Sequence, residues 1–343
     1  MTADHRFDAA MTRALELALL GPAHGVNPQV GAVILDASLN IIAEGWHLGS
    51  GTPHAEVMAL SKLPSGKAPA GATAVVTLAP CNHFGKTGPC AQALIAAGIS
   101  RVVYASSDPG DASSGGAATL NAAGIETIAG VLKAEADEQS RVWLTATKQG
   151  RPFVTLKWAT SLDGRAAATD GTSQWISGPE SRADSHLRRS QVDAILVGTG
   201  TVLADNPTLT ARHPDGSLYE HQPLRVVIGD RTIPADFKIF NTDAETLVLQ
   251  TRDLHQVLLQ LRDRGVKHVW VEGGPQVASR FVAANLVNEY VIYQAPMLIG
   301  GDRTALTDIG VASMPQAKHL QIKSVRNLGD DLAIVAAPKN GEN

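Results

Sequence analysis

Both cysteines of this 343-residue chain, Cys81 and Cys90, lie in one short segment, PCNHFGKTGPC. A second segment, TPHAE, places His54 and Glu56 close together. One imidazole and two thiolates suit zinc, and a fourth coordination position left open for water is typical of a catalytic zinc site. Zinc lowers the pKa of such a water to about 7, and a nearby carboxylate that does not bind the metal can then carry protons. We therefore expect His54, Cys81 and Cys90 to bind Zn²⁺ and Glu56 to be catalytic.

The order of these residues is that of the zinc deaminases, in which a His-x-Glu motif precedes a Pro-Cys-x-x-Cys motif. Here His54-Ala55-Glu56 and Pro80-Cys81 match, but eight residues rather than two separate the cysteines. The other interpretations are a disulfide, two unused thiols, or a structural zinc site with His83 as the fourth ligand. A closed structural site would leave Glu56 without a role, so the sequence favours a catalytic site.

The wider cysteine spacing belongs to a longer pattern that includes NPQVGAVI, GWHLGSGTPHAE and GATAVVTLAPC. This pattern resembles the deaminase half of the RibD family, the bifunctional pyrimidine deaminase/reductases of riboflavin biosynthesis. The family usually has Ser where Asn82 stands and often Arg where Lys86 stands. The resemblance implies that the pyrimidine and phosphate pocket is lined by Asn27, His47, His83 and Lys86.

The second half of the chain resembles the reductase half of the same family, which is similar to dihydrofolate reductase and uses NADPH. The matching segments are FVTLKWATSLDGRAA, SQWISG, GTGTVLADNPTLTAR, RVVIGD and VEGGPQVASRFVAANLVNEYVIYQAPMLIGG. The resemblance implies that NADPH is bound by Ala159, Trp175, Thr201, Asp205, Gly274, Pro275, Gln276, Val277, Ala278, Ser279 and Arg280. It implies that the substrate is bound by Ser173, Arg189, Leu209, Arg212 and Glu272.

Local patterns in this half are compatible with a cofactor site but do not establish one, because the half contains neither GxGxxG nor a P-loop lysine. VEGGPQV predicts a strand, a glycine turn and a helix that starts at Pro275, and such a start can bind a pyrophosphate. Lys157 and Asp205 are candidates for positioning the nicotinamide or donating a proton. Asp230 stands where the family usually has Ser, and an acid there is unfavourable beside the 2′-phosphate of NADPH.

Alternating β-branched and Ala/Leu-rich segments predict an α/β protein with the motifs at strand ends and helix starts. We expect a cytidine-deaminase-like α/β/α domain over residues 1–147 and a dihydrofolate-reductase-like α/β domain over residues 150–343. Strands are expected in the first domain near residues 30–35, 41–46, 72–79 and 101–105. In the second they are expected near residues 153–159, 193–198, 224–229, 246–250, 268–273 and 289–295.

Composition limits the partners of the protein. One alternative is a nucleic-acid or nucleoside zinc deaminase with an accessory domain. Lys and Arg number 29 against 33 Asp and Glu, and only 4% of residues are aromatic, which disfavours a nucleic-acid substrate. No apolar segment approaches the roughly 20 residues of a membrane span. We expect a cytoplasmic enzyme that deaminates a diaminopyrimidine carrying a phosphoribosyl group and then reduces the ribosyl chain with NADPH. A non-catalytic zinc-stabilised binding protein is the remaining alternative, and the resemblance suggests a homo-oligomer.

Overall fold

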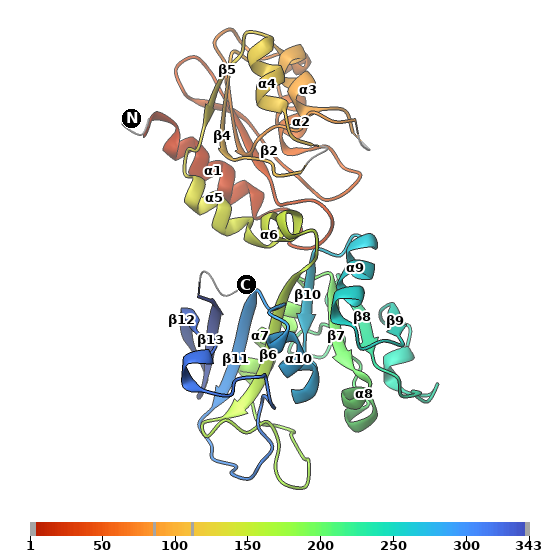
Figure 1. Ribbon diagram of the computed structural model, residues 1–343. Helices are drawn as coiled ribbons and strands as arrows, with labels where there is room; N and C mark the ends of the chain where they lie inside the picture. The colour runs from red at the N-terminus through yellow and green to blue at the C-terminus, as the bar shows by residue number, and fades with distance from the viewer. Residues whose placement is uncertain (1–4, 85–86, 111–112, 340–343) are drawn as a thin grey trace. The chain divides into compact units, whose positions relative to one another are not determined.

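The computed structural model describes residues 5–84, 87–110 and 113–339. Its contacts divide the chain into two units, Met1–Gly150 and Arg151–Asn343 (Figure 1). Each unit is built around one β-sheet with helices on both faces. Among the helices of the described residues, none combines the length and the apolar character needed to span a membrane.

The sheet of the first unit has five strands in the order β2-β1-β3-β4-β5. Strand β1 is antiparallel to β2 and β3, whereas β3, β4 and β5 are parallel. The carboxyl ends of β3 and β4 therefore meet at one edge of the sheet. The strands are β1 (Gly31–Leu35), β2 (Ile41–Trp46), β3 (Thr73–Leu78), β4 (Arg101–Ser106) and β5 (Glu126–Ala129).

Helices pack on both faces of this sheet, which explains why β1 and β3 are buried along their whole length. Apolar side chains of α2, α3 and α4 form the core on one face, and those of α1 and α5 form it on the other. The helices are α1 (Asp8–Ala18), α2 (Ala55–Ser61), α3 (Cys90–Ala97), α4 (Gly116–Ala122), α5 (Lys133–Gln139) and α6 (Arg141–Gln149).

Two glycines allow backbone segments near the zinc motif to approach each other closely. A Cβ atom on Gly45 of β2 would lie 2.3 Å from the Ala55 carbonyl oxygen at the start of α2. A Cβ atom on Gly116 would lie 1.8 Å from the Pro80 carbonyl oxygen, beside Cys81. Any larger residue at either position would displace a segment that carries a predicted zinc ligand or Glu56.

The second unit has an eight-stranded sheet in the order β12-β13-β11-β6-β10-β7-β8-β9. The six strands from β11 to β9 are parallel, and β13 and β12 extend the sheet as an antiparallel edge. The strands are β6 (Phe153–Ser161), β7 (Ala194–Gly198), β8 (Leu224–Ile228), β9 (Thr246–Leu249), β10 (His268–Val271), β11 (Glu289–Ala295), β12 (Leu320–Leu328) and β13 (Asp331–Pro338).

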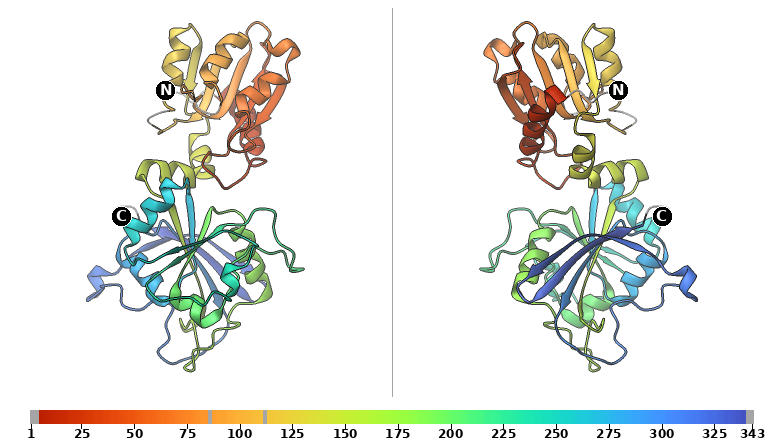
Figure 2. Two further views of the ribbon diagram at one scale, coloured as in Figure 1. Left: turned by 90° about the vertical axis from the view of Figure 1, so that its right-hand side faces the viewer. Right: turned by 90° about the vertical axis from the view of Figure 1, so that its left-hand side faces the viewer.

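Figure 2 shows this sheet covered by helices on both faces. Helices α9 and α10 bury apolar side chains in the larger core of the unit. On the other face α8 contributes Val202, and α7 is linked to Tyr293 of β11 through Asp184. The helices are α7 (Pro179–Arg189), α8 (Thr199–Asp205), α9 (Leu254–Asp263) and α10 (Pro275–Ala283).

The expected α/β class and the strand segments named above agree with the structure. The sequence did not predict β5, β12, β13 or α8. Strand β12 is almost wholly exposed, so it shows no buried apolar face that would mark it as a strand.

Candidate functional site

The predicted zinc ligands come from three separate segments that meet at the carboxyl edge of β3. His54 is the residue before α2, Cys81 follows β3 after two residues, and Cys90 is the first residue of α3. The backbone N–H of Cys90 donates to the Cys81 Sγ at 3.4 Å, which fixes the second thiol relative to the first. Both cysteines are buried and unbridged, so the disulfide interpretation is not supported.

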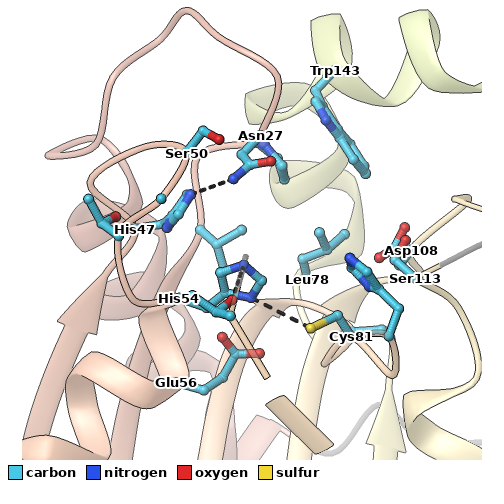
Figure 3. Close-up of a pocket in the computed structure, with 17 residues that line it drawn as sticks. Asn27, His47, Ser50, His54, Glu56, Leu78, Cys81, Asp108, Ser113 and Trp143 are labelled. Carbon is cyan, nitrogen blue, oxygen red and sulfur yellow. Dashed lines mark hydrogen bonds between the residues drawn. The ribbon is translucent and has the colours of Figure 1, made fainter. Parts of the chain in front are cut away.

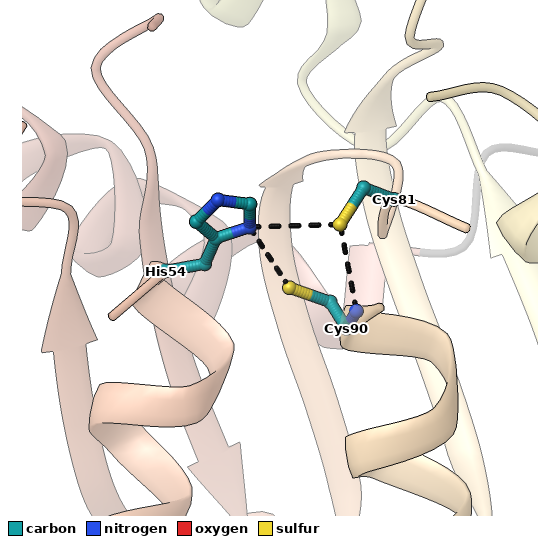
Figure 4. Close-up of side chains that lie close together, drawn as sticks. All are labelled: His54, Cys81 and Cys90. Carbon is teal, nitrogen blue, oxygen red and sulfur yellow. Dashed lines mark hydrogen bonds between the residues drawn. The ribbon is translucent and has the colours of Figure 1, made fainter. Parts of the chain in front are cut away.

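The three ligand atoms are close enough to share one metal ion (Figure 4). His54 Nδ1 lies 3.1 Å from Cys90 Sγ and 3.5 Å from Cys81 Sγ. A tetrahedral zinc with its usual Zn–S and Zn–N bond lengths requires N···S separations of about 3.5 Å, so the donor set fits zinc. No other described His, Cys, Asp or Glu side chain joins this group, His83 included. The arrangement therefore matches the three-ligand catalytic type rather than the closed structural type.

The electrostatics of this group also suit a metal that needs deprotonated ligands. The contact with the Cys90 thiol lowers the pKa of Cys81 to about 4. The same contact and burial raise the pKa of Cys90, and a hydrogen bond with Cys81 raises the pKa of His54. Zinc binding requires both thiolates and a neutral imidazole, so it is coupled to the release of the protons that these groups carry.

Glu56 lies beside the ligands in the first turn of α2 but outside the group that could hold the metal. Its side chain is buried, with 3% of its surface exposed, and burial raises the pKa of its carboxyl group. It lines a cavity of about 270 Å³ together with His54 and Cys81 (Figure 3). A buried carboxyl group with a raised pKa, next to a zinc site, is suited to take up and release a proton.

The structure brings three of the four predicted pyrimidine-pocket residues to this cavity, namely Asn27, His47 and His83. Asn27 Nδ2 lies 2.8 Å from His47 Nε2, and the other ring nitrogen of His47 lies 3.1 Å from the Pro53 carbonyl oxygen. His83 Nδ1 is buried and has no hydrogen-bond partner among the described residues, so it is available to a ligand. Lys86 lies outside the described residues.

The cavity also contains residues that the sequence did not single out. Thr87 Oγ1 lies 3.4 Å from His54 Nε2, the ring nitrogen opposite the ligand atom. Trp143 of α6 is the only Phe, Tyr or Trp among the described lining residues, and its indole N–H donates to the Val26 carbonyl oxygen at 3.0 Å. No spacing pattern marks a lone Thr or a helical Trp, so only the fold could reveal them. Asp108 and Ser113 complete the far wall (Figure 3).

In the second unit, the residues expected to bind NADPH gather partly at the carboxyl ends of the parallel strands. Gly274 precedes α10, and its N–H donates to the Thr201 side chain of α8 at 3.0 Å. Ala278 and Ser279, by contrast, are each 1% exposed, and the Ser279 hydroxyl accepts a hydrogen bond from the Thr307 N–H. These two side chains support α10 from inside the fold.

The other predicted cofactor residues lie on α10, α8 and β6 and in the loop before α7. The remaining residues of α10 in the set are Pro275, Gln276, Val277 and Arg280, of which Gln276 and Arg280 are exposed. Asp205 ends α8, and partial desolvation raises the pKa of its carboxyl group. Ala159 is half-buried on β6, and the Trp175 ring is 67% exposed beneath the Arg182 guanidinium.

A buried ion cluster links two of the predicted substrate residues. Arg189 Nε and Nη2 donate to the Glu272 carboxylate at 2.6 and 2.7 Å. Trp270 Nε1 donates to the same carboxylate at 2.6 Å, and Lys157 Nζ lies 3.6 Å from it. Burial opposes ionisation, but the charges of Arg189 and Lys157 outweigh it and lower the pKa of Glu272. The Glu272 carboxylate and the Arg189 guanidinium are therefore charged at neutral pH.

Arg212 and Leu209 lie in the segment that follows α8. Arg212 Nη1 donates to the Thr208 hydroxyl at 2.9 Å, and Leu209 is buried with a positive φ of 51°. The fully buried Arg225 supports this segment, because its Nη1 donates to the Thr208 carbonyl oxygen at 3.1 Å. Ser173, the last predicted substrate residue, is half-buried in the loop before α7.

Comparison with known proteins gives matches over both units. Residues 5–106 match the cytidine and deoxycytidylate deaminase zinc-binding region, and residues 152–334 match the RibD C-terminal domain. The chain is 48% identical over 308 residues to a riboflavin biosynthesis protein RibD of Mycobacterium tuberculosis, covering 90% of each chain. It is 37% identical to the RibD protein of Escherichia coli, covering 94% of this chain and 97% of the other.

Solved structures agree over the same length. A RibD structure from Acinetobacter baumannii matches with a TM-score of 0.88 and 33% identity, covering 97% of this chain and 99% of the other. A Thermotoga maritima structure matches with a TM-score of 0.82 and 32% identity, covering 98% and 99%. The latter is described as a diaminohydroxyphosphoribosylaminopyrimidine deaminase/5-amino-6-(5-phosphoribosylamino)uracil reductase.

Proposed function

This chain belongs to the RibD family of bifunctional deaminase/reductases of riboflavin biosynthesis, and we propose that Glu56 and the cavity around His54 carry out its deamination step. The family couples a zinc-binding deaminase domain to a reductase domain that uses NADPH. The observation that carries the proposal is the position of the buried Glu56 carboxyl group, which lies in one cavity with two of the ligands but outside the ligand group.

The substrate of the first unit is a 2,5-diamino-6-(5-phosphoribosylamino)pyrimidin-4-one. Zinc bound by His54, Cys81 and Cys90 would supply Lewis acidity that activates a water molecule. Glu56 accepts a proton from the attacking water and delivers a proton to the departing amino group, which its raised pKa permits. Asn27, His47 and His83 orient the ring, and the orphaned Nδ1 of His83 supports a direct contact.

The substrate of the second unit is the resulting 5-amino-6-(5-phosphoribosylamino)uracil. The hydride comes from NADPH, so the protein mainly positions the two reactants. The start of α10 directs the positive end of its helix dipole at the pyrophosphate. Arg212 binds the substrate phosphate. The ion-paired side chains of Arg189, Glu272 and Lys157 lie beside the substrate. Asp205, with its raised pKa, is the better candidate for proton donation, because Lys157 is held near Glu272.

The proposed partners are small molecules rather than nucleic acid or membrane, and we place the protein in the cytoplasm as a homo-oligomer. The formal charge of −4 supports small-molecule partners rather than nucleic acid. The two unbridged cysteines support a cytoplasmic location. Oligomer formation rests on the family alone.

Incubation of the purified protein with the diaminopyrimidine phosphate tests the assignment of both units. Ammonia is expected with and without NADPH, whereas the ribityl product is expected only with NADPH. Ammonia release that required NADPH would contradict the independent hydrolytic step. Absence of the ribityl product in the presence of NADPH would contradict the reductase assignment.

A further inference from the structure

Asp230 occupies the position directly after Gly229 at the carboxyl end of β8, where its charge bears on cofactor choice. In dinucleotide-binding α/β sheets, an acidic residue near the adenosine ribose accepts a hydrogen bond from the 2′-hydroxyl of NAD, whereas an arginine accommodates the 2′-phosphate of NADP. On its own, Asp230 would therefore favour NADH. The inference below rests on the proposed reductase site and concerns how this chain selects NADPH there.

The carboxylate of Asp230 is already paired. Its Oδ2 lies 2.7 Å from Arg252 Nε, and Arg252 stands three residues after the end of β9. The carbonyl oxygen of Arg252 accepts a hydrogen bond from Arg280 Nη2 of α10 at 2.7 Å, which ties this segment to the predicted cofactor helix. The Asp230–Arg252 pair is solvent-exposed, and it places the Arg252 guanidinium beside the Asp230 carboxylate at the carboxyl edge of the sheet.

Arg231 provides a second guanidinium at the same edge. A Cβ atom on Gly200 would lie 2.6 Å from Arg231 Nη2, so the Arg231 side chain reaches back over the first turn of α8. Within the part of the chain that the structure describes, Arg231 has no carboxylate partner, and it is exposed. A glycine at position 200 is what allows the guanidinium to lie against the backbone there.

These groups lie at the edge of the sheet where the proposed function places the dinucleotide. Gly229 N–H donates to the Leu249 carbonyl oxygen at 3.2 Å, which joins the ends of β8 and β9. Thr201, one residue beyond Gly200, accepts the Gly274 N–H that precedes α10. The proposed pyrophosphate position and the arginines therefore share one edge. The three arginines 231, 252 and 280 against Asp230 and Asp253 leave a formal surplus of one positive charge.

We propose that Arg231 and Arg252 bind the 2′-phosphate of NADPH, and that Arg252 at the same time prevents Asp230 from selecting NADH. A phosphate monoester carries close to two negative charges at neutral pH, and guanidinium groups bind it in a bidentate manner. Arg231 supplies the unpaired cation. The pairing of Asp230 with Arg252 offsets part of the repulsion between this carboxylate and the 2′-phosphate.

Equilibrium binding of NADP⁺ and NAD⁺ to the full-length protein, measured by calorimetry, tests this proposal without relying on turnover. Arg231→Ala is expected to weaken NADP⁺ binding by about tenfold or more and to leave NAD⁺ binding unchanged, because one charge-assisted contact is lost. Arg252→Ala is expected to weaken NADP⁺ binding and to strengthen NAD⁺ binding, since Asp230 becomes free to accept the ribose hydroxyl. The affinity of the unsubstituted protein for NADP⁺ should fall with salt more steeply than that of Arg231→Ala.

Arg264→Ala is the matched control, because Arg264 is an exposed arginine that follows α9, whereas Arg252 precedes it. It should leave both affinities unchanged. Equal weakening of NADP⁺ and NAD⁺ by Arg231→Ala, or no effect on either, would overturn the proposed 2′-phosphate contact. Failure of Arg252→Ala to improve NAD⁺ binding would overturn the role given to Asp230. If the unsubstituted protein bound neither dinucleotide, the reductase site itself would be wrong, and ammonia release would show that the protein is folded.

Discussion

Glu272→Gln is expected to destabilise the second unit strongly, because it removes the only negative charge of a buried cluster. The Glu272 side chain is 9% exposed, and that of Arg189 is 13% exposed. The substitution keeps the volume of the side chain and leaves Arg189 and Lys157 as two cations without a counterion. Breaking a buried ion pair by removing one partner costs about 3–5 kcal/mol. We expect the free energy of unfolding to fall by about that amount.

Urea unfolding of the full-length protein, followed by circular dichroism and tryptophan fluorescence, measures this loss. Glu245→Gln is the control in the same unit, because Glu245 and Arg264 lie 3.7 Å apart with 72% and 50% of their side-chain surfaces exposed. An exposed pair of this kind contributes at most about 1 kcal/mol. A double-mutant cycle with Arg189→Met isolates the interaction of Arg189 with Glu272.

The pH dependence of the difference in unfolding free energy between the unsubstituted protein and Glu272→Gln gives an independent check. The folded-state pKa of Glu272 lies below its unfolded value of about 4.3. The stabilisation is therefore complete above the unfolded pKa and is lost as the pH falls through the folded pKa. The difference in unfolding free energy between the unsubstituted protein and Glu272→Gln should stay constant near neutral pH and become smaller only in acid. This reasoning would be refuted if Glu272→Gln lost no more unfolding free energy than Glu245→Gln. It would also be refuted if the difference between the unsubstituted protein and Glu272→Gln became larger in acid.

Three further substitutions test the deaminase unit. Thr87→Val should weaken zinc binding by about tenfold, as measured by competition with a chelator, because His54 loses the contact to its second ring nitrogen. Trp143→Ala should raise KM for deamination by about tenfold with little change in kcat, whereas Trp143→Phe should retain a flat surface for the pyrimidine and most of the affinity. Gly45→Ala should lower both thermal stability and zinc content, because the new Cβ atom collides with the start of α2; unchanged zinc content would contradict this packing argument.

The zinc centre could be predicted from the sequence because its ligands are residue types with strong metal preferences in a recognisable order. His54, Cys81 and Cys90 meet in the structure as that order suggests. Thr87 and Trp143 could not be predicted in this way, because such residues are common and only the fold brings them to the cavity.

In the second unit, resemblance indicated which residues matter but not how they interact. The bond from Arg189 to Glu272 spans 83 residues, and no local pattern encodes such a distant pair. The departure at Asp230 suggested a weakened NADP contact, whereas the structure pairs that carboxylate with Arg252. The missed strand β5 and helix α8 are short, and α8 begins with Thr-Gly-Thr, residues of low helix propensity.

Glu56→Gln, with zinc content and ammonia release measured on the same preparation, tests the separation between metal binding and proton transfer most directly. The substituted protein should hold as much zinc as the original, because Glu56 lies outside the ligand group. Its ammonia release should fall by at least about a hundredfold, since the amide cannot carry the proton. Unchanged ammonia release, or loss of the zinc together with the activity, would contradict the assigned role of this carboxyl group.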